Sequence, residues 1–397
     1  MKHLWLAGLL CGTLFFSGCW SKREINELAI VSSAAFDCTD EGWEVTAEIF
    51  LPSSSQGAGG GGITAARQSW LAKGNGPTVF TAIHNLTLKV PRRVYWAHCS
   101  AIIIGEEVAR SGLIQVLDFW DRDPEARRSA LLFVYQGEAA QLLTKSFGAM
   151  ERTVGMQLAG LANTSKISGY ADVSTIHQFL VALSLPGMDP NTACLVLRPL
   201  VEVPGLVATG KKDLKTGTAV TELNLDKQAL FRGTKLVGWL DKREARGLLW
   251  VRGTIKDLIT IQVPGNGEQK IDLEVFNSSR KLSVKQKDGI PQITVQIELG
   301  LGLASQESSK ELIKQSPSLE RKAQSVVENE LKAAWSKACK LEVDPFGFGH
   351  LIYTKNPKLW HKLQPSWPGG VAIHWQVRAQ VESSGLSLGG PRELEER

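Results

Sequence analysis

The sequence predicts an α+β protein of several domains, in which mixed sheets are flanked by helices. Two patterns lead to this prediction. In the N-terminal half, segments with strand periodicity alternate with segments of helical periodicity. In the C-terminal half, a run of strands precedes one long amphipathic segment, which predicts a long helix packed on a mostly antiparallel sheet. With 43% hydrophobic and 21% charged residues, the composition excludes a fibrous or disordered chain.

The N-terminus predicts a lipoprotein signal peptide over residues 1–18. Lys2 precedes an apolar run, Leu4–Phe16, that is shorter than the roughly 20 residues of a membrane-spanning helix. The tetrad Phe16-Ser17-Gly18-Cys19 resembles a lipobox, although Phe16 replaces the usual leucine. We therefore expect Cys19 to carry a diacylglycerol with fatty acids such as palmitate. An ordinary signal peptide that ends in cysteine is the alternative.

A lipid on Cys19 would hold the protein on the outer face of a membrane. Two acyl chains anchor firmly, because each buried methylene contributes about 0.8 kcal/mol. No other apolar stretch of the sequence reaches membrane length. This location, rather than the charge, argues against nucleic acid as a partner.

Five residues are predicted to lie near the membrane or at an interface. Three of them directly follow the anchor and suit the interfacial layer, although they could equally begin the fold. The other two belong to the stretch Ile49–Gly105, which contains no acidic residue and could face lipid headgroups or an acidic partner. A solvated surface is the alternative explanation of this stretch. The five residues are Trp20, Lys22, Arg23, Arg92 and Arg93.

The N-terminal domain is predicted to span residues 19–203, as one unit or as two subdomains. Trp43, Val45, Ala47 and Ile49 alternate with polar residues, which predicts a strand paired with Ile30–Asp37. A Gly- and Ser-rich stretch near 53–76 is predicted to be a flexible excursion. Its glycines fit G-x-G-x-x-G, but no acidic residue follows that could bind a ribose, so composition explains the match.

Helices and strands alternate through the rest of this domain. Pro77 opens a predicted helix, as proline at a first helical turn favours. The segments that follow are a buried strand over Val94–Ile104, a helix through Val108, Ile114 and Leu117, a strand over Ala130–Tyr135, helices from Glu138, over Arg152–Ala162 and over Val173–Leu183, and a strand over Ala193–Pro199. Residues 204–217 have the composition of a linker.

The C-terminal domain is predicted over 218–385, before a disordered tail at 386–397. Gly233-Thr234 predicts a hairpin, and Asp241 with Glu244 resembles a helix capping box. Further elements are strands over Leu258–Val263, Ile271–Phe276 and Lys281–Lys287, the clearest alternation from Ile293 to Leu303, a helical stripe from Leu319 to Ala338, and a last strand over Val371–Val381.

A search for chemistry predicts no catalytic residue, metal site or cofactor. The sequence contains no zinc helix, nucleophile elbow, phosphate-binding loop or EF-hand loop. Asp121 and Asp123 could suggest acid-base chemistry or a cation site, but a helix end or turn explains them better. His98 lies in an apolar strand pattern and is predicted to be a core histidine rather than a ligand.

Cysteines and aromatic residues are assigned to packing or left open. Four cysteines are widely spaced and are predicted to be buried free thiols: Cys38, Cys99, Cys194 and Cys339. Three aromatic residues near the C-terminus could form a partner surface or pack in the core, and the pattern favours neither: Phe346, Phe348 and Trp360.

Several motifs along the chain resemble the Ger(x)C family, the C-subunit lipoproteins of spore nutrient-germination receptors. The similarity begins at Cys19-Trp20-Ser21-Lys22-Arg23-Glu24-Ile25, where Ser21 replaces a common aspartate. It continues through Arg93-Val94-Tyr95-Trp96-Ala97-His98, Arg122-Asp123-Pro124, Leu236-Val237-Gly238-Trp239-Leu240, Arg246-Gly247-Leu248-Leu249-Trp250 and Asp344-Pro345-Phe346-Gly347-Phe348-Gly349.

This resemblance implies a subunit that joins two integral membrane proteins at the inner membrane of a dormant endospore. There it would act in germination triggered by amino acids or sugars, without catalytic residues and with several small α+β domains. The alternative is a membrane-tethered solute-binding lipoprotein that holds a nutrient itself. Solute-binding proteins use repeated βαβ units, whereas adjacent strands followed by one long helix favour the receptor subunit. An anchored hydrolase is the weakest reading, because no nucleophile or acid-base set is present.

Overall fold

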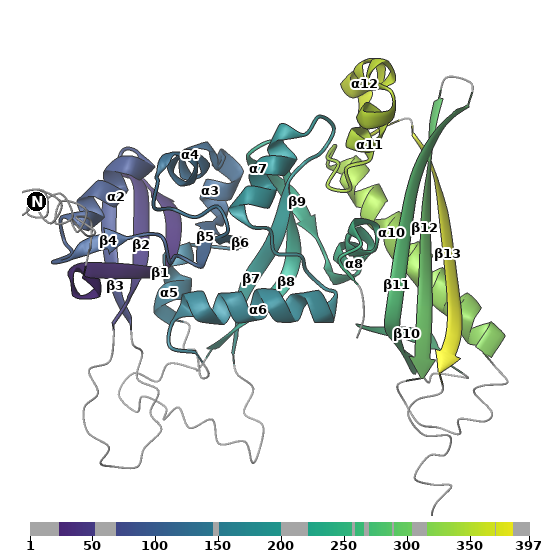
Figure 1. Cartoon of the computed structure of the whole chain (residues 1–397), viewed down its shortest axis with the longest axis horizontal. Helices are drawn as coiled ribbons and strands as arrows, with labels where there is room; N and C mark the ends of the chain where they lie inside the picture. Colours follow the sequence, from purple (N-terminus) through teal and green to yellow (C-terminus); the bar gives the residue numbers. More distant parts are fainter. Residues whose placement is uncertain are drawn as a thin grey trace, which may run out of the picture.

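The computed structural model describes residues 24–51, 69–145, 151–199, 221–255, 259–265, 270–287, 290–303, 316–369 and 371–383. Two sheets lie at opposite ends of its long axis (Figure 1). The predicted signal peptide, Cys19, Trp20, Lys22, Arg23, the linker at 204–217 and the tail at 386–397 lie outside these residues. Within the described ranges, no helix combines the length and apolarity that crossing a bilayer requires.

The larger sheet is mixed and has the strand order β3-β2-β1-β5-β6-β7-β8-β9, with β4 also paired to β1. Its centre is parallel, from β1 through β5 and β6 to β7, and both sides are antiparallel. The strands are β1 (Leu28–Thr39), β2 (Gly42–Phe50), β3 (Ser69–Gly76), β4 (Arg93–Tyr95), β5 (Ala101–Gly105), β6 (Leu131–Tyr135), β7 (Asn191–Pro199), β8 (Thr221–Arg232) and β9 (Lys235–Leu240).

Helices cover this sheet and form two hydrophobic cores with it. They are η1 (Ile25–Glu27), α2 (Val79–Thr87), α3 (Glu106–Ser111), α4 (Ile114–Arg122), α5 (Ala139–Lys145), α6 (Val154–Ser168) and α7 (Ile176–Ser184). Two predicted elements are divided. A turn after Tyr95 splits the predicted strand over Val94–Ile104, and Gly112, with a φ of 124°, separates α3 from α4. A positive φ is accessible to glycine at no steric cost, so the helix ends there.

Part of the predicted flexible excursion is a regular strand. Ser69–Gly76 forms β3 and pairs antiparallel with β2, so the prediction for 53–76 is wrong at these residues. A Cβ atom on Gly74 would lie 2.2 Å from the Ala82 carbonyl oxygen, within α2. The glycines of β3 therefore permit close packing of α2 rather than a loop. Residues 52–68 lie outside the described ranges.

The smaller sheet has the order β10-β11-β12-β13 and is antiparallel except between β12 and β13. The long helix α10 (Ser316–Lys340) crosses one face of it (Figure 1) and buries the predicted stripe from Leu319 to Ala338. The strands are β10 (Ile259–Pro264), β11 (Lys270–Lys287), β12 (Ile290–Leu303) and β13 (Ala372–Ser383). The remaining helices are α8 (Lys242–Arg252), α11 (Phe348–Lys355), α12 (Pro357–Leu363) and η2 (Gln364–Ser366).

The predicted α+β class is confirmed, including the long helix on a mostly antiparallel sheet. The predicted boundary does not separate the two sheets, however. Strands β8 and β9 follow the predicted linker and yet pair with β7 as the last strands of the larger sheet. The division into domains at 204–217 stays a prediction.

Candidate functional site at the junction of the sheets

Two aspartates connect the segment before β7 to the segment after α10. The Asp344 amide donates a hydrogen bond of 2.8 Å to the Asp189 carboxylate. The Asp189 amide in turn donates to the Asp344 carbonyl oxygen at 2.9 Å. These two bonds tie the larger sheet to the loop that follows α10.

The Asp344 carboxylate organises that loop from inside the protein. It is fully buried and accepts hydrogen bonds from the amides of Phe346, Gly347 and Gly349, at 3.0, 2.9 and 2.7 Å. The Trp367 indole donates a fourth bond at 3.2 Å. Burial raises the pKa of Asp344 to about 7, although the amide donors oppose this shift. The carboxylate thus fixes the turn from which α11 begins.

The aromatic residues of this loop form core rather than a partner surface. Phe346 and Phe348 stack at 5.3 Å between ring centroids, and Trp335 meets both edge-on. Phe346, Phe348 and Trp360 are all buried, which resolves the two alternatives that the sequence left open. Gly187 packs against Trp360, where a Cβ atom would approach the ring to 2.7 Å.

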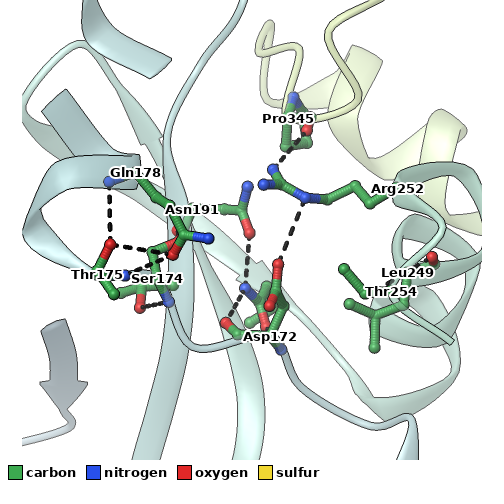
Figure 2. Close-up of polar contacts among 11 residues, drawn as sticks. Asp172, Ser174, Thr175, Gln178, Asn191, Leu249, Arg252, Thr254 and Pro345 are labelled. Carbon is green, nitrogen blue, oxygen red and sulfur yellow. Dashed lines mark hydrogen bonds and ion pairs between the residues drawn. The ribbon is translucent and has the colours of Figure 1, made fainter. Parts of the chain in front are cut away.

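Arg252, at the end of α8, contacts both sides of the junction. Figure 2 shows its guanidinium between Asp172 and Pro345. It lies 3.4 Å from the Asp172 carboxylate and donates to the Pro345 carbonyl oxygen at 3.3 Å. Gln228 of β8 donates to the Asp172 carbonyl oxygen at 2.8 Å and to the Asn191 side chain at 2.7 Å. Helix α8 is therefore held by polar contacts to the segment before α7 and to the loop after α10.

The predicted interface residues within the described ranges lie away from this junction. Arg93 begins β4, and its guanidinium bonds the Glu125 carboxylate at 2.6 Å. Arg92 is exposed and makes no ion pair with the described residues. Cys19 and the three residues predicted beside the anchor lie outside the description, so their roles stay predictions.

The three residues considered for acid-base chemistry or ligand binding lie in an ion pair or in turns. Asp121 pairs with Arg128 at the surface. Asp123 accepts the amides of Glu125 and Ala126, which is the turn that the sequence favoured. The prediction for His98 is wrong: it is exposed in the turn after β4 and lies 5.6 Å from the Tyr95 ring, because the chain leaves the sheet there.

In the described part of the chain, the thiols lie apart from one another, and so do the side-chain types that commonly bind metals. Cys38, Cys99, Cys194 and Cys339 are free, with Cys99 and Cys194 buried and the others half-buried. Burial raises the pKa of Cys99 and of Cys194 to about 12. No three His, Cys, Asp or Glu side chains gather there in a way that could hold a metal ion.

Sequence reasoning missed the junction itself. The Asp344-Pro345-Phe346-Gly347-Phe348-Gly349 motif enters the sequence analysis only through the family resemblance. No local pattern, however, connects Asp344 to Asp189 or Arg252 to Asp172, because these partners are far apart in sequence.

Comparison with known proteins identifies related chains along nearly the whole length. The model of the spore germination protein N-terminal domain matches residues 21–196, and the spore germination B3/GerAC-like C-terminal model matches 226–385. Spore germination protein KC of Bacillus subtilis is 26% identical over 376 residues, covering 90% of this chain and 89% of that protein. Spore germination protein B3 of the same organism is 24% identical over 361 residues, covering 89% and 90%. The crystal structure of the GerBC protein aligns with a TM-score of 0.49 and 21% identity, over 88% of this chain and 96% of that chain.

Proposed function

Because the chain belongs to the spore germination B3/GerAC-like family, we propose that it acts in spore germination as the lipid-anchored subunit of a nutrient-germinant receptor. The observation that carries this proposal is the match of both family models, in order, to residues 21–196 and 226–385. The curated relatives KC and B3 are named as spore germination proteins, and each match covers about nine-tenths of both chains.

The proposed mode of action is contact with two integral membrane subunits rather than catalysis. The polar groups of the junction support this view, since they bind one another. Asp344 accepts four N–H bonds from its own chain, and Arg252 lies between Asp172 and the Pro345 carbonyl. The bonds of Asp344 and Arg252 connect the larger sheet to the loop that follows α10 and so hold the two sheets together. Such a framework can present separate surfaces to two partners.

The proposed location is the outer face of a membrane, in spores the inner membrane. The lipobox-like tetrad that ends in Cys19 supports this anchor, and Trp20, Lys22 and Arg23 suit the interfacial layer. Diacylglycerol on Cys19 would hold the subunit beside its membrane partners.

The test is a pull-down of the C-terminally tagged chain from detergent-extracted spore membranes. We expect two integral membrane proteins in fixed stoichiometry with the tagged chain. The Cys19→Ala variant is the control: it should leave the membrane fraction, and spores that carry it should germinate more slowly with a panel of amino acids and sugars. Recovery of the tagged chain alone would contradict the receptor-subunit proposal.

A membrane-tethered solute-binding protein predicts a different outcome. The tagged chain would then be recovered without membrane subunits and would bind one nutrient tightly in calorimetry. Wild-type germination of spores with Cys19→Ala would contradict the role of the anchor while leaving the family assignment intact.

A further inference from the structure

Two large apolar side chains lie on the outward face of α2. Phe80 and Leu88 are 74% and 73% exposed. Together with the exposed His84 they are spaced four residues apart and therefore lie on one side of the helix and its C-cap. The opposite side of α2 packs in the core. A surface helix normally turns polar residues outward, so two large exposed apolar side chains in this position require an explanation.

Two more exposed apolar residues lie next to this face. Ile114, at the start of α4, is 65% exposed. The Val79 amide donates to the Gln115 side chain at 3.2 Å, which brings the starts of α2 and α4 together. Ile25, in η1, is 69% exposed and closely precedes Leu28, the residue that pairs with Arg93 of β4. Ile25 is therefore close to the turn 88–92 that connects α2 to β4.

This turn carries positive charge beside Leu88. Lys89 and Arg92 are exposed, and neither forms an ion pair with a described residue. The Lys89 ammonium donates only to a backbone carbonyl, at 2.9 Å. Acidic side chains on the neighbouring elements include Glu125, Glu44 and Asp118, which pair with Arg93, Lys73 and Arg122, and the exposed Glu24 and Glu27 of η1.

The chain length from the proposed anchor sets how far this surface can be from the membrane. Glu24 is the first described residue and follows Cys19 by five positions. A fully extended chain spans at most about 3.6 Å per residue, so Glu24, directly before η1, lies within about 18 Å of the lipidated residue. Helix α2 and strand β4 lie at one end of the long axis, and β13 lies at the other (Figure 1).

We propose that this end of the protein rests in the headgroup layer of an anionic membrane, with α2 lying on the surface. The residues concerned, called the α2 face, are Ile25, Phe80, Leu88, Lys89, Arg92 and Ile114. Apolar side chains enter the boundary of the acyl chains, and the two cations contact lipid phosphates. The inference rests on the lipid anchor of the proposed function and adds an orientation to it: the smaller sheet points away from the bilayer.

The experiment places a fluorophore on the α2 face of the lipidated full-length protein. Leu88→Cys is labelled with an environment-sensitive dye, and the protein is reconstituted into vesicles of phosphatidylcholine with one-third phosphatidylglycerol. The matched control is Ile290→Cys, an isoleucine 52% exposed at the start of β12 in the other sheet. Labelled wild-type protein supplies the background from native thiols. We expect spin-labelled lipids to quench the dye at position 88 several-fold more than at position 290.

The possible results distinguish a failure of the lipid anchor from a failure of the proposed membrane contact of the α2 face. Flotation with the vesicles but equal quenching at both positions would overturn the α2 face and leave the anchor standing. No flotation would overturn both proposals. Quenching or a blue shift at position 88 in spore membranes, but not in lipid vesicles, would assign the face to a protein partner and overturn the lipid assignment.

A second set of variants measures how strongly the α2 face binds vesicles when the lipid anchor is absent. In the Cys19→Ser background, Leu88→Ser should lower the vesicle partition coefficient about tenfold, because one large apolar side chain no longer leaves water. Arg92→Gln should lower it about fivefold with phosphatidylglycerol and not with phosphatidylcholine alone. Ile290→Ser is the control and should change nothing. Equal binding of all these variants would overturn the proposal.

Discussion

The Arg246 guanidinium of α8 contacts the Glu330 carboxylate of α10, which is only 2% exposed. The Trp250 indole, one turn further along α8, donates to the same carboxylate at 3.0 Å. This buried pair is the main polar contact between two helices that otherwise meet through apolar side chains. It connects the helix at the junction to the helix that covers the smaller sheet.

Removal of Arg246 is therefore expected to destabilise the protein strongly. Arg246→Ala leaves the buried Glu330 charge with only the indole as partner and should lower the free energy of unfolding by about 3–5 kcal/mol. The control is Lys332→Ala, which removes an exposed pair with Glu328 on the same helix and should cost about 0–1 kcal/mol. Urea unfolding followed by tryptophan fluorescence measures both. Equal midpoints for the two variants would refute the argument.

The Asp344 carboxylate should be similarly important. Asp344→Ala removes the fully buried acceptor of four N–H groups and should lower the free energy of unfolding by at least about 3 kcal/mol, since each unsatisfied donor carries its own desolvation penalty. Asp118→Ala, at a carboxylate 52% exposed and paired with Arg122, is the control and should cost less than about 1 kcal/mol. Urea midpoints again provide the comparison. A loss no greater than that of the control would show that water replaces the carboxylate.

The raised pKa of Asp344 predicts how stability depends on pH. Burial raises this pKa from 3.8 to about 7, so between pH 4 and 7 the folded state keeps a proton that the unfolded state has lost. The stabilisation that Asp344 adds to the free energy of unfolding is therefore complete below pH 4, and it is lost as the pH rises through 7. Asp37, whose pKa burial raises to about 6, acts in the same direction.

Asp344→Asn isolates this contribution, because an amide does not titrate. Urea midpoints measured from pH 4 to 8 should decrease less steeply for the variant than for the wild type. Identical slopes for the wild type and Asp344→Asn would mean that Asp344 stays ionised throughout this range.

Local signals predicted the elements whose structure depends on neighbouring residues. The hairpin at Gly233-Thr234 is present, with Arg232 paired to Lys235. The capping box is also present, with Asp241 and Glu244 bonding each other's amides at 2.8 and 3.0 Å. Both depend on contacts within four residues, and such contacts are visible as short sequence patterns.

Features that depend on distant residues were not predictable in this way. The two predicted strands around Ile271–Phe276 and Lys281–Lys287 are one strand, β11, because a long partner, β12, continues beside it. Strand β8 follows the predicted linker but pairs with β7, which precedes it, and no local pattern in either strand indicates this partner. At the junction, Arg252 contacts Asp172, which lies far from it in the sequence, and no pattern around either residue indicates the other. Periodicity describes a segment's own faces and not the segment that will cover them.

Two helical glycines should respond to alanine in opposite directions. On Gly247 of α8, a Cβ atom would lie 2.1 Å from the Glu330 carbonyl oxygen, so the helices must separate to admit a methyl group. Gly247→Ala should therefore lower the free energy of unfolding by about 1–3 kcal/mol. Gly160 of α6 has no atom within 4 Å of the same position. Gly160→Ala should raise the free energy of unfolding by about 0.5–1 kcal/mol, because alanine loses less backbone entropy in a helix. Thermal unfolding of both variants measures the difference, and a destabilised Gly160→Ala beside an unaffected Gly247→Ala would contradict the close packing of α8 on α10.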